Sequence, residues 1–162
     1  MSREPGRPIK LAILLPTHEK VDALFAFDLA QMVSLTMSVM PADQGHDLGI
    51  IMMTNTYIHQ ARQELLQNAL ADGVTHVLWL DSDMRFPPDA FLRLLQREVP
   101  FVGINYAKRR MPPKFVGIKK FPRSEDEQGQ YLDTLESSEG LEECDILGFG
   151  CFLMETATLV NL

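Results

Sequence analysis

Short aliphatic runs alternate with longer amphipathic stretches along most of this chain, and this alternation restricts the fold more than any other feature. The runs lie at residues 9–15, 48–53, 75–80 and 100–106. Nearly continuous aliphatic sequence is typical of strands covered on both faces, as in a parallel sheet. Strands joined through helices form such sheets by right-handed crossovers. We therefore expect an α/β fold with a Rossmann-like, mostly parallel sheet and helices on both faces.

Helical signals fill the intervals between these runs. Apolar residues recur at largely helical spacing over 21–40, and Pro41 ends the pattern. A second helix is expected from Ile58 to the glycine at position 73, and a third begins with Pro87, Pro88 and Asp89. The sequence predicts a helix in each of the first three crossovers.

The remaining third of the chain carries weaker signals. Residues 114–118 and 146–154 are expected as further strands, and a new helix is expected to begin near residue 155. The segments 124–130 and 136–143 are polar and acidic, which is typical of surface turns. We expect a disordered N-terminus over residues 1–8 and a single domain over residues 9–162.

Bulk properties exclude several classes of protein. The formal net charge is -7 and the pI is near 5.0, so nucleic acid is not an expected partner. No run approaches the ~20 apolar residues that cross a bilayer, and no secretory signal opens the chain. The two cysteines, Cys144 and Cys151, are expected as reduced thiols. A cytoplasmic protein is expected.

Polar clusters follow four of the predicted strands. They comprise Pro16, Thr17 and His18; Thr54, Asn55 and Thr56; Asp81, Ser82 and Asp83; and Tyr106, Ala107, Lys108 and Arg109. Ligands of open α/β sheets bind beyond the carboxyl ends of the strands. These clusters are therefore expected to meet on one rim.

Asp81 and Asp83 are the strongest candidates for chemistry. In an extended backbone, residues two apart point to the same side, which would place the carboxylates roughly 6.5 to 7 Å apart. Two carboxylates suit Mg²⁺ or Mn²⁺, which keep the oxygens of substrate phosphates as further ligands. Arg62, Lys108, Arg109 or Arg110 could add positive charge. The alternative is that both aspartates only end a strand and cap a turn.

Residues 76–89, with Asp81-Ser82-Asp83 at their centre, resemble the metal-binding (DxD) segment of GT-A glycosyltransferases, particularly family 2-like members of bacteria and phages. The resemblance extends to residues 14–17, 55–62 and 102–109, and more weakly to 148–154. It implies a nucleotide-diphosphate-sugar transferase core that passes a sugar to an unknown acceptor with the help of Mn²⁺ or Mg²⁺.

The resemblance also implies roles for individual residues. Pro16 and Thr17 would line the nucleotide pocket, and Asn55 and Arg62 would approach base or phosphate. Asp81 would contact ribose and metal, and Asp83 the metal. Contacts with the nucleotide-sugar donor are also expected from Ser82, Lys108 and Arg109. UDP is the nucleotide expected from the resemblance. In many members of the group, however, an aspartate after the second strand binds the uracil ring, and this chain has no aspartate there.

Two alternatives remain open. The chain ends at Leu162, whereas relatives continue into an acceptor-binding half that holds the general base, so a truncated, non-catalytic nucleotide-sugar-binding module is one alternative. A homo-oligomer is possible through the face that such a half would cover. A phosphatase of the haloacid dehalogenase type also places two aspartates after a strand, but normally after the first strand. The acidic residues Glu142, Glu143 and Asp145 are interpreted as a solvated loop.

Overall fold

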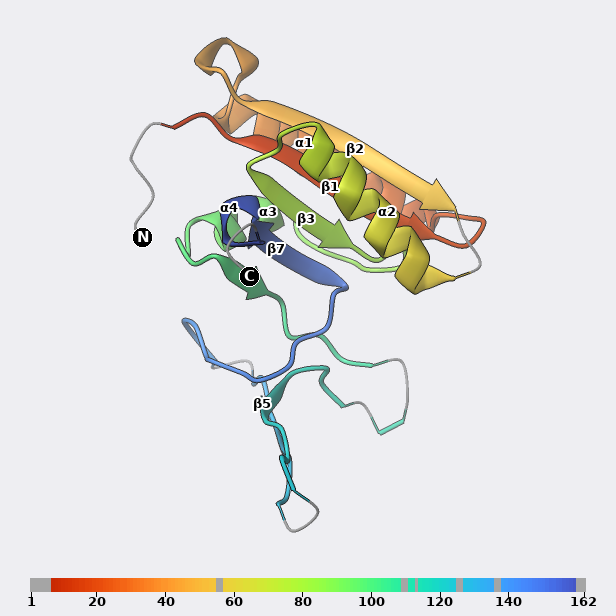
Figure 1. Ribbon diagram of the computed structural model, residues 1–162, viewed down its shortest axis with the longest axis vertical. Coiled ribbons are helices and arrows are strands. Elements are labelled where there is room, and N and C mark those ends of the chain that lie inside the picture. The colour runs from red at the N-terminus through yellow and green to blue at the C-terminus, as the bar shows by residue number, and fades with distance from the viewer. Residues whose placement is uncertain are drawn as a thin grey trace.

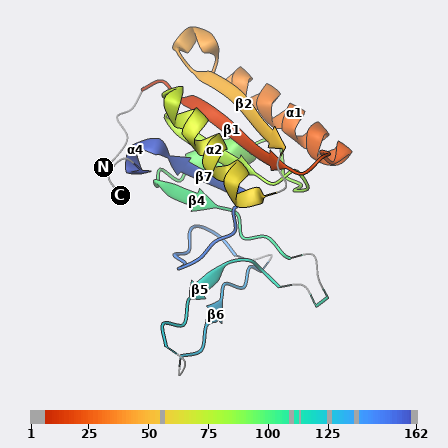
Figure 2. The same ribbon diagram turned by 45° about the vertical axis from the view of Figure 1, so that its right-hand side comes forward.

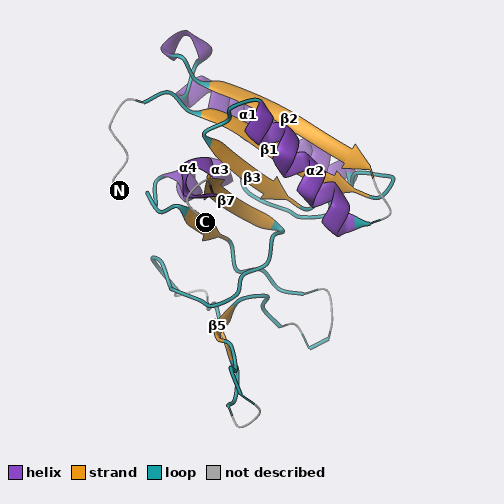
Figure 3. Ribbon diagram, viewed as in Figure 1, coloured by secondary structure: helices purple, strands orange, loops and turns teal. Residues whose placement is uncertain are grey.

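The computed structural model describes residues 7–54, 57–108, 111–112, 114–124, 127–135 and 138–159 (Figure 1). Residues 1–6, most of the N-terminus expected to be disordered, lie outside this range. The helices and strands alternate as expected through the first half of the chain (Figure 3). In chain order they are β1 (Lys10–Thr17), α1 (Ala23–Val39), a 3-10 turn (Ala42–Gln44), β2 (Asp47–Thr54), α2 (Ile58–Ala71), β3 (His76–Leu80), α3 (Ala90–Leu95), β4 (Phe101–Gly103), β5 (Ile118–Lys120), β6 (Gln130–Tyr131), β7 (Cys151–Glu155) and α4 (Thr156–Leu159).

A five-stranded sheet with the order β2-β1-β3-β7-β4 forms the centre of the protein. The strands β2, β1 and β3 are parallel, whereas β7 is antiparallel to both of its neighbours, β3 and β4. The expected α/β class with a mostly parallel sheet is therefore confirmed. The sequence predicted the last strand but not its insertion, in the opposite direction, between β3 and β4.

Helices cover both faces of this sheet. Leu11, Ile13 and Leu15 of β1 point into a core that also contains Phe25 and Met32 of α1. The alternate β1 residues, Ala12 and Leu14, pack with Leu65 and Ala69 of α2 on the opposite face. α3 contributes Phe91 to the first of these cores. The nearly continuous aliphatic sequence of β1 thus reflects burial on both faces.

Strand β2 differs from its expectation. The run 48–53 was predicted to be buried, but β2 lies at the edge of the sheet, with β1 as its one neighbour among the described residues. Ile50 is 47% exposed and Met52 is 56% exposed. Aliphatic composition predicted the strand correctly and its burial wrongly, because composition does not distinguish an edge strand from a central one.

The segment after β4 also corrects the sequence interpretation. Residues 114–118 do not form a strand of their own; Phe115 makes an isolated bridge with Ala107, and β5 begins only at Ile118. β5 and β6 pair as a separate two-stranded ribbon within an arm that extends away from the sheet (Figure 2). Asn105 holds the base of this arm, because its Nδ2 donates to Leu132 O and its Oδ1 accepts from Gly117 N, each at 2.8 Å.

Candidate functional site

Asp81, Ser82 and Asp83 follow β3 directly, at the edge where β1, β2 and β3 all end (Figure 1). The extended conformation expected for this tripeptide is wrong. The N–H of Met84 donates to the C=O of Asp81 at 3.1 Å, so residues 81–84 form a tight turn with Ser82 and Asp83 at its centre. Asp is favoured as the first residue of such a turn. The carboxylate spacing calculated for a strand therefore does not apply.

Helix α1 fixes this turn from one side. The N–H of Asp22, the N-cap residue of α1, donates to Ser82 O at 3.2 Å. The carboxylate of Asp28, which is buried, accepts from Arg85 Nε at 2.5 Å and from Phe86 N at 3.3 Å. The hydrogen bond from Arg85 is the main cause that lowers the pKa of Asp28, although burial opposes it. Contacts with α1 thus anchor the loop that carries Asp81 and Asp83 both within the turn, at Ser82, and just after it, at Arg85 and Phe86.

The pair formed by Asp28 and Arg85 predicts a pH dependence of stability. A carboxyl group whose pKa is lowered by folding stabilises the protein above its unfolded pKa of about 3.9, and this contribution disappears as the pH falls through the folded pKa. We expect the Tm of wild type to fall below about pH 4 more steeply than that of Asp28→Asn. Thermal unfolding by circular dichroism between neutral pH and pH 3 measures this. Asp43→Asn, at an exposed position, is the matched control; a steep acid limb retained in Asp28→Asn contradicts the assignment.

Arg62 of α2 reaches Asp81 from the other side. Its Nη2 lies 2.8 Å from Asp81 Oδ1, and the two side chains are 30% and 32% exposed. The guanidinium carbon lies 5.3 Å from the centre of the Phe149 ring, over which the group stacks. Arg62 Nε is buried and has no hydrogen-bond partner within the described part of the chain. One cation therefore offsets the charge of Asp81, and its guanidinium is held between a carboxylate and an aromatic ring.

Tyr106 is a residue that the sequence placed on the rim without assigning it a role. Its Oη accepts a hydrogen bond from Gly150 N at 3.1 Å. Burial raises the pKa of Tyr106, and the negative charges of Asp81 and Asp83 raise it further, against the opposing effects of Gly150 and Arg62. Both carboxylates thus lie close enough to act on one phenol. A neutral phenol retains an O–H donor, which suits a phosphate or sugar oxygen.

Two glycines make room for this phenol. A Cβ at Gly150 would lie 2.6 Å from Tyr106 Cζ, and one at Gly148 would lie 2.6 Å from Tyr106 Oη. Both glycines precede β7, and Gly150 lies in the turn that leads into it, where the missing side chain allows the ring to approach the backbone closely. From the sequence, residues 148–150 were predicted only as part of a strand, so the contact with Tyr106 and the stacking of Phe149 under Arg62 were both missed.

The other predicted site residues have varied surroundings. Pro16 and Thr17 are buried at the end of β1, where the hydroxyl groups of Thr17 and Thr54 lie 3.3 Å apart. Proline is tolerated there because pairing with β3 ends at Leu14. Lys108 is exposed, and its N–H donates to Lys114 O at 2.7 Å. Asn55 and Arg109 lie outside the described residues.

The turn offers two carboxylates, those of Asp81 and Asp83, as oxygen donors. Among the described residues, no three His, Cys, Asp or Glu side chains converge as a cation site. Mg²⁺ and Mn²⁺ are commonly bound by one or two carboxylates together with substrate phosphates and water. Asp81 and Asp83 match that smaller donor set, and they are the residues that would hold such a cation.

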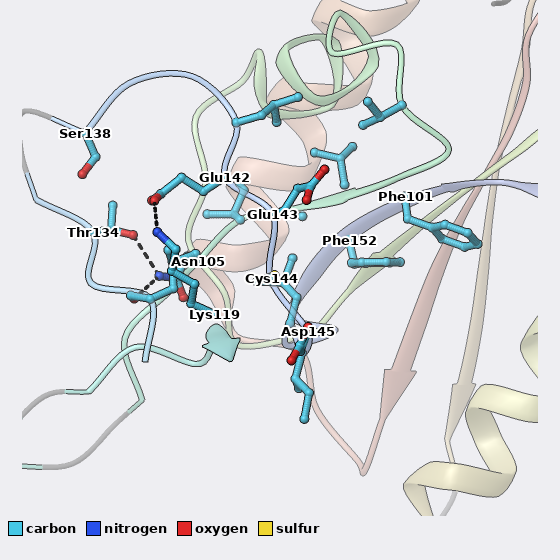
Figure 4. A pocket seen from close by; sticks show the side chains of 18 of the residues that line it. Phe101, Asn105, Lys119, Thr134, Ser138, Glu142, Glu143, Cys144, Asp145 and Phe152 are labelled. Atoms are coloured by element: carbon cyan, nitrogen blue, oxygen red, sulfur yellow. Dashed lines mark hydrogen bonds and ion pairs between the residues drawn. The ribbon is translucent and has the colours of Figure 1, made fainter. Parts of the chain in front are cut away.

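A cavity of about 1310 Å³ lies beside this site (Figure 4). Residues of the adjacent strands β4 and β7 line one side of it, and the segment 138–147 lines the other. Phe149, which stacks under Arg62, also lines the cavity, and its ring lies 4.9 Å from that of Phe152. Glu142, interpreted from the sequence as part of a solvated loop, lines the cavity as well and accepts from Lys119 Nζ at 3.2 Å. The carboxylate site and the cavity thus share an aromatic wall.

Comparisons with known proteins add no family assignment: no protein-family model matches the chain, and no curated protein is similar to it in sequence.

Both cysteines, Cys144 and Cys151, are free thiols. Burial raises the pKa of Cys151 to about 12, so this thiol stays protonated at neutral pH. Within the described residues, every helix is too short or too polar to cross a membrane.

Proposed function

We propose that this chain is a GT-A-like core that binds a nucleotide-diphosphate sugar through Mn²⁺ or Mg²⁺, as part of a glycosyltransferase. The observation that carries the proposal is the position of Asp81 and Asp83 in an anchored turn at the carboxyl end of β3, with Arg62 bonded to Asp81. Ligands of α/β sheets bind at this edge. Two free thiols are compatible with the proposed cytoplasmic setting.

In the proposed complex, Asp81 and Asp83 would hold the cation, and the diphosphate would supply further oxygen ligands. When bound, the metal would act as a Lewis acid that neutralises charge on the departing diphosphate. Arg62 would donate to a phosphate oxygen, for which a planar guanidinium is well suited. The phenolic O–H of Tyr106 would donate a hydrogen bond to the same ligand, because burial and both carboxylates favour the neutral form of the phenol.

Calorimetric titration of UDP and GDP into the purified chain, with and without Mn²⁺, tests the proposal. We expect binding to require the metal and to be strongly weakened in Asp83→Ala, because the substitution removes one of the two charged oxygen ligands proposed for the cation. Asp43→Ala removes an exposed carboxylate from the 3-10 turn and serves as the control. Release of sugar or its transfer to an acceptor would support the enzyme, whereas binding without turnover would favour the binding module. Absence of binding to either nucleotide in the presence of Mn²⁺ would overturn the proposal.

A further inference from the structure

Strand β2 is a long edge strand without the usual protection against pairing. It spans eight residues, and its seven residues after Asp47 carry no charge and no proline. Its register with β1 runs from Lys10↔Asp47 to Thr17↔Thr54 without a bulge. Edge strands of monomeric proteins are usually short, or are blocked by lysine, proline or a bulge. The outer side of β2 therefore remains competent to pair with another strand.

Backbone geometry identifies the groups that would form such pairs. The N–H of Asp47 donates to Ile9 O of the β1 side at 2.8 Å. Backbone groups of successive residues in a strand point to opposite sides. The backbone groups of Gly49, Ile51 and Met53 therefore face β1 together with those of Asp47. The N–H and C=O groups of the even-numbered residues, which are Leu48, Ile50, Met52 and Thr54, point outward from the edge of the sheet.

Two of the residues whose backbone groups point outward also carry exposed, apolar side chains. Ile50 pairs with Ile13, and Met52 pairs with Leu15. Ile13 and Leu15 belong to the core beneath α1. Residues paired across adjacent strands share a face, so Ile50 and Met52 lie on the face of the sheet that α1 covers. Their exposed fractions, 47% and 56%, leave an apolar margin beside that helix.

Helix α1 extends this uncharged margin. Asp28 is its one charged residue, and it is buried against Arg85 on the flank that faces the start of α3. At about 100° per residue, the flank opposite Asp28 carries Ala26, Ala30, Val33 and Met37. These four residues are exposed or half-buried. A surface helix normally shows charged residues outside its core-facing stripe, and this flank shows none.

We propose that β2 is a homodimer interface, in which two copies pair β2 with β2 in antiparallel fashion to form one ten-stranded sheet. A two-fold axis perpendicular to the sheet places the same face of both copies on the same side. Even-numbered residues of one β2 therefore lie opposite even-numbered residues of the other. The outward backbone groups of Ile50 then meet those of Met52 in the second copy. The exposed apolar side chains cover one another, and the two α1 flanks approach through uncharged residues.

The absence of charge on β2 after Asp47 allows a second copy to approach there, and interface size requires the helix as well as the strand. Two chains of net charge -7 repel each other over most of their surface, but the segment 48–54 contributes nothing to that repulsion. A stable interface buries roughly 1,200–2,000 Å² in total, more than one strand pair provides. The contribution of α1 is therefore a required part of the interface.

Light scattering during size-exclusion chromatography, combined with amide hydrogen exchange, tests the dimer in the full chain. Wild type at about 100 μM, a concentration in the range where weak homodimers associate, is expected at twice the monomer mass of 18.3 kDa. The double variant Ile50→Lys, Met52→Lys is expected at the monomer mass. Ala30→Glu is expected at the monomer mass when it is measured at concentrations below about 100 μM. Leu135→Lys, at a 68% exposed position of the arm, is the matched control and should remain dimeric.

Hydrogen exchange distinguishes loss of pairing from loss of folding. In wild type, the outward amides of Leu48, Ile50 and Met52 should be protected; in the double lysine variant they should exchange rapidly. The amides of Gly49 and Ile51, which face β1, should stay protected in both. A monomeric wild type, unprotected even-numbered amides in wild type, or a dimer that survives the double lysine substitution would each overturn the proposal.

Discussion

Asp81→Asn is expected to weaken Mn²⁺-dependent binding of UDP or GDP by at least about 100-fold, since even residues that only support a metal ligand contribute 10- to 100-fold to metal affinity. Asparagine retains the shape of aspartate and an oxygen that can accept from Arg62. It also preserves the backbone bonds of the turn, from Asp81 N to Gly150 O and from Met84 N to Asp81 O. The substitution therefore removes the negative charge with little other change. Calorimetric titration at neutral pH, with and without Mn²⁺, measures the loss.

The stability of Asp81→Asn separates the binding effect from a folding effect. The pair formed by Arg62 and Asp81 is about one-third exposed, so solvent screening limits its contribution to stability to about 1 kcal/mol or less. We expect the Tm to change by only a few degrees. Unchanged Mn²⁺-dependent binding in Asp81→Asn would show that this aspartate serves the turn alone. A large fall in Tm would show that its charge is needed for folding instead.

The sequence predicted the layers of the fold because periodicity is a direct consequence of burial. The aliphatic run 9–15 lies in a strand that is covered by α1 on one face and α2 on the other. The carboxyl ends of parallel strands share one edge of a sheet, so the position of Asp81 on the rim also followed from the expected parallel direction of the strands. These features depend on local pattern and general topology.

Features that depend on contacts between distant residues were not predicted. The turn at Asp81 depends on Met84 and on anchors in α1, so no short pattern distinguished it from an extended segment. The edge position of β2 depends on which strands pair, and the antiparallel course of β7 depends on the path of the chain through the β5–β6 arm. Tyr106 and Gly150 are 44 positions apart, and only their packing shows that they belong to one site.

The contact between Tyr106 and Gly150 supports a second prediction with a large effect. Gly150→Ala places a Cβ 2.6 Å from Tyr106 Cζ, 2.7 Å from Oη and 2.8 Å from Cε1, so the ring must move. Overpacking of this kind destabilises a protein by about 1–3 kcal/mol. The displaced phenol also loses its hydrogen bond from Gly150 N and moves relative to Asp81 and Asp83. We expect both a lower free energy of unfolding, measured with urea, and weaker nucleotide binding.

A double-mutant cycle with Tyr106→Ala identifies the collision as the cause. Tyr106→Ala alone removes the ring and leaves space beside Gly148 and Gly150, and in this background the alanine at 150 has no aromatic atom to meet. The free-energy cost of the double variant should therefore be smaller than the sum of the single costs, with a coupling of about 0.5–3 kcal/mol. Additive costs would mean that Gly150 is needed for its backbone conformation. Nucleotide binding should not recover in the double variant, because the phenol that contacts Gly148 and Gly150 and is influenced by Asp81 and Asp83 is then absent.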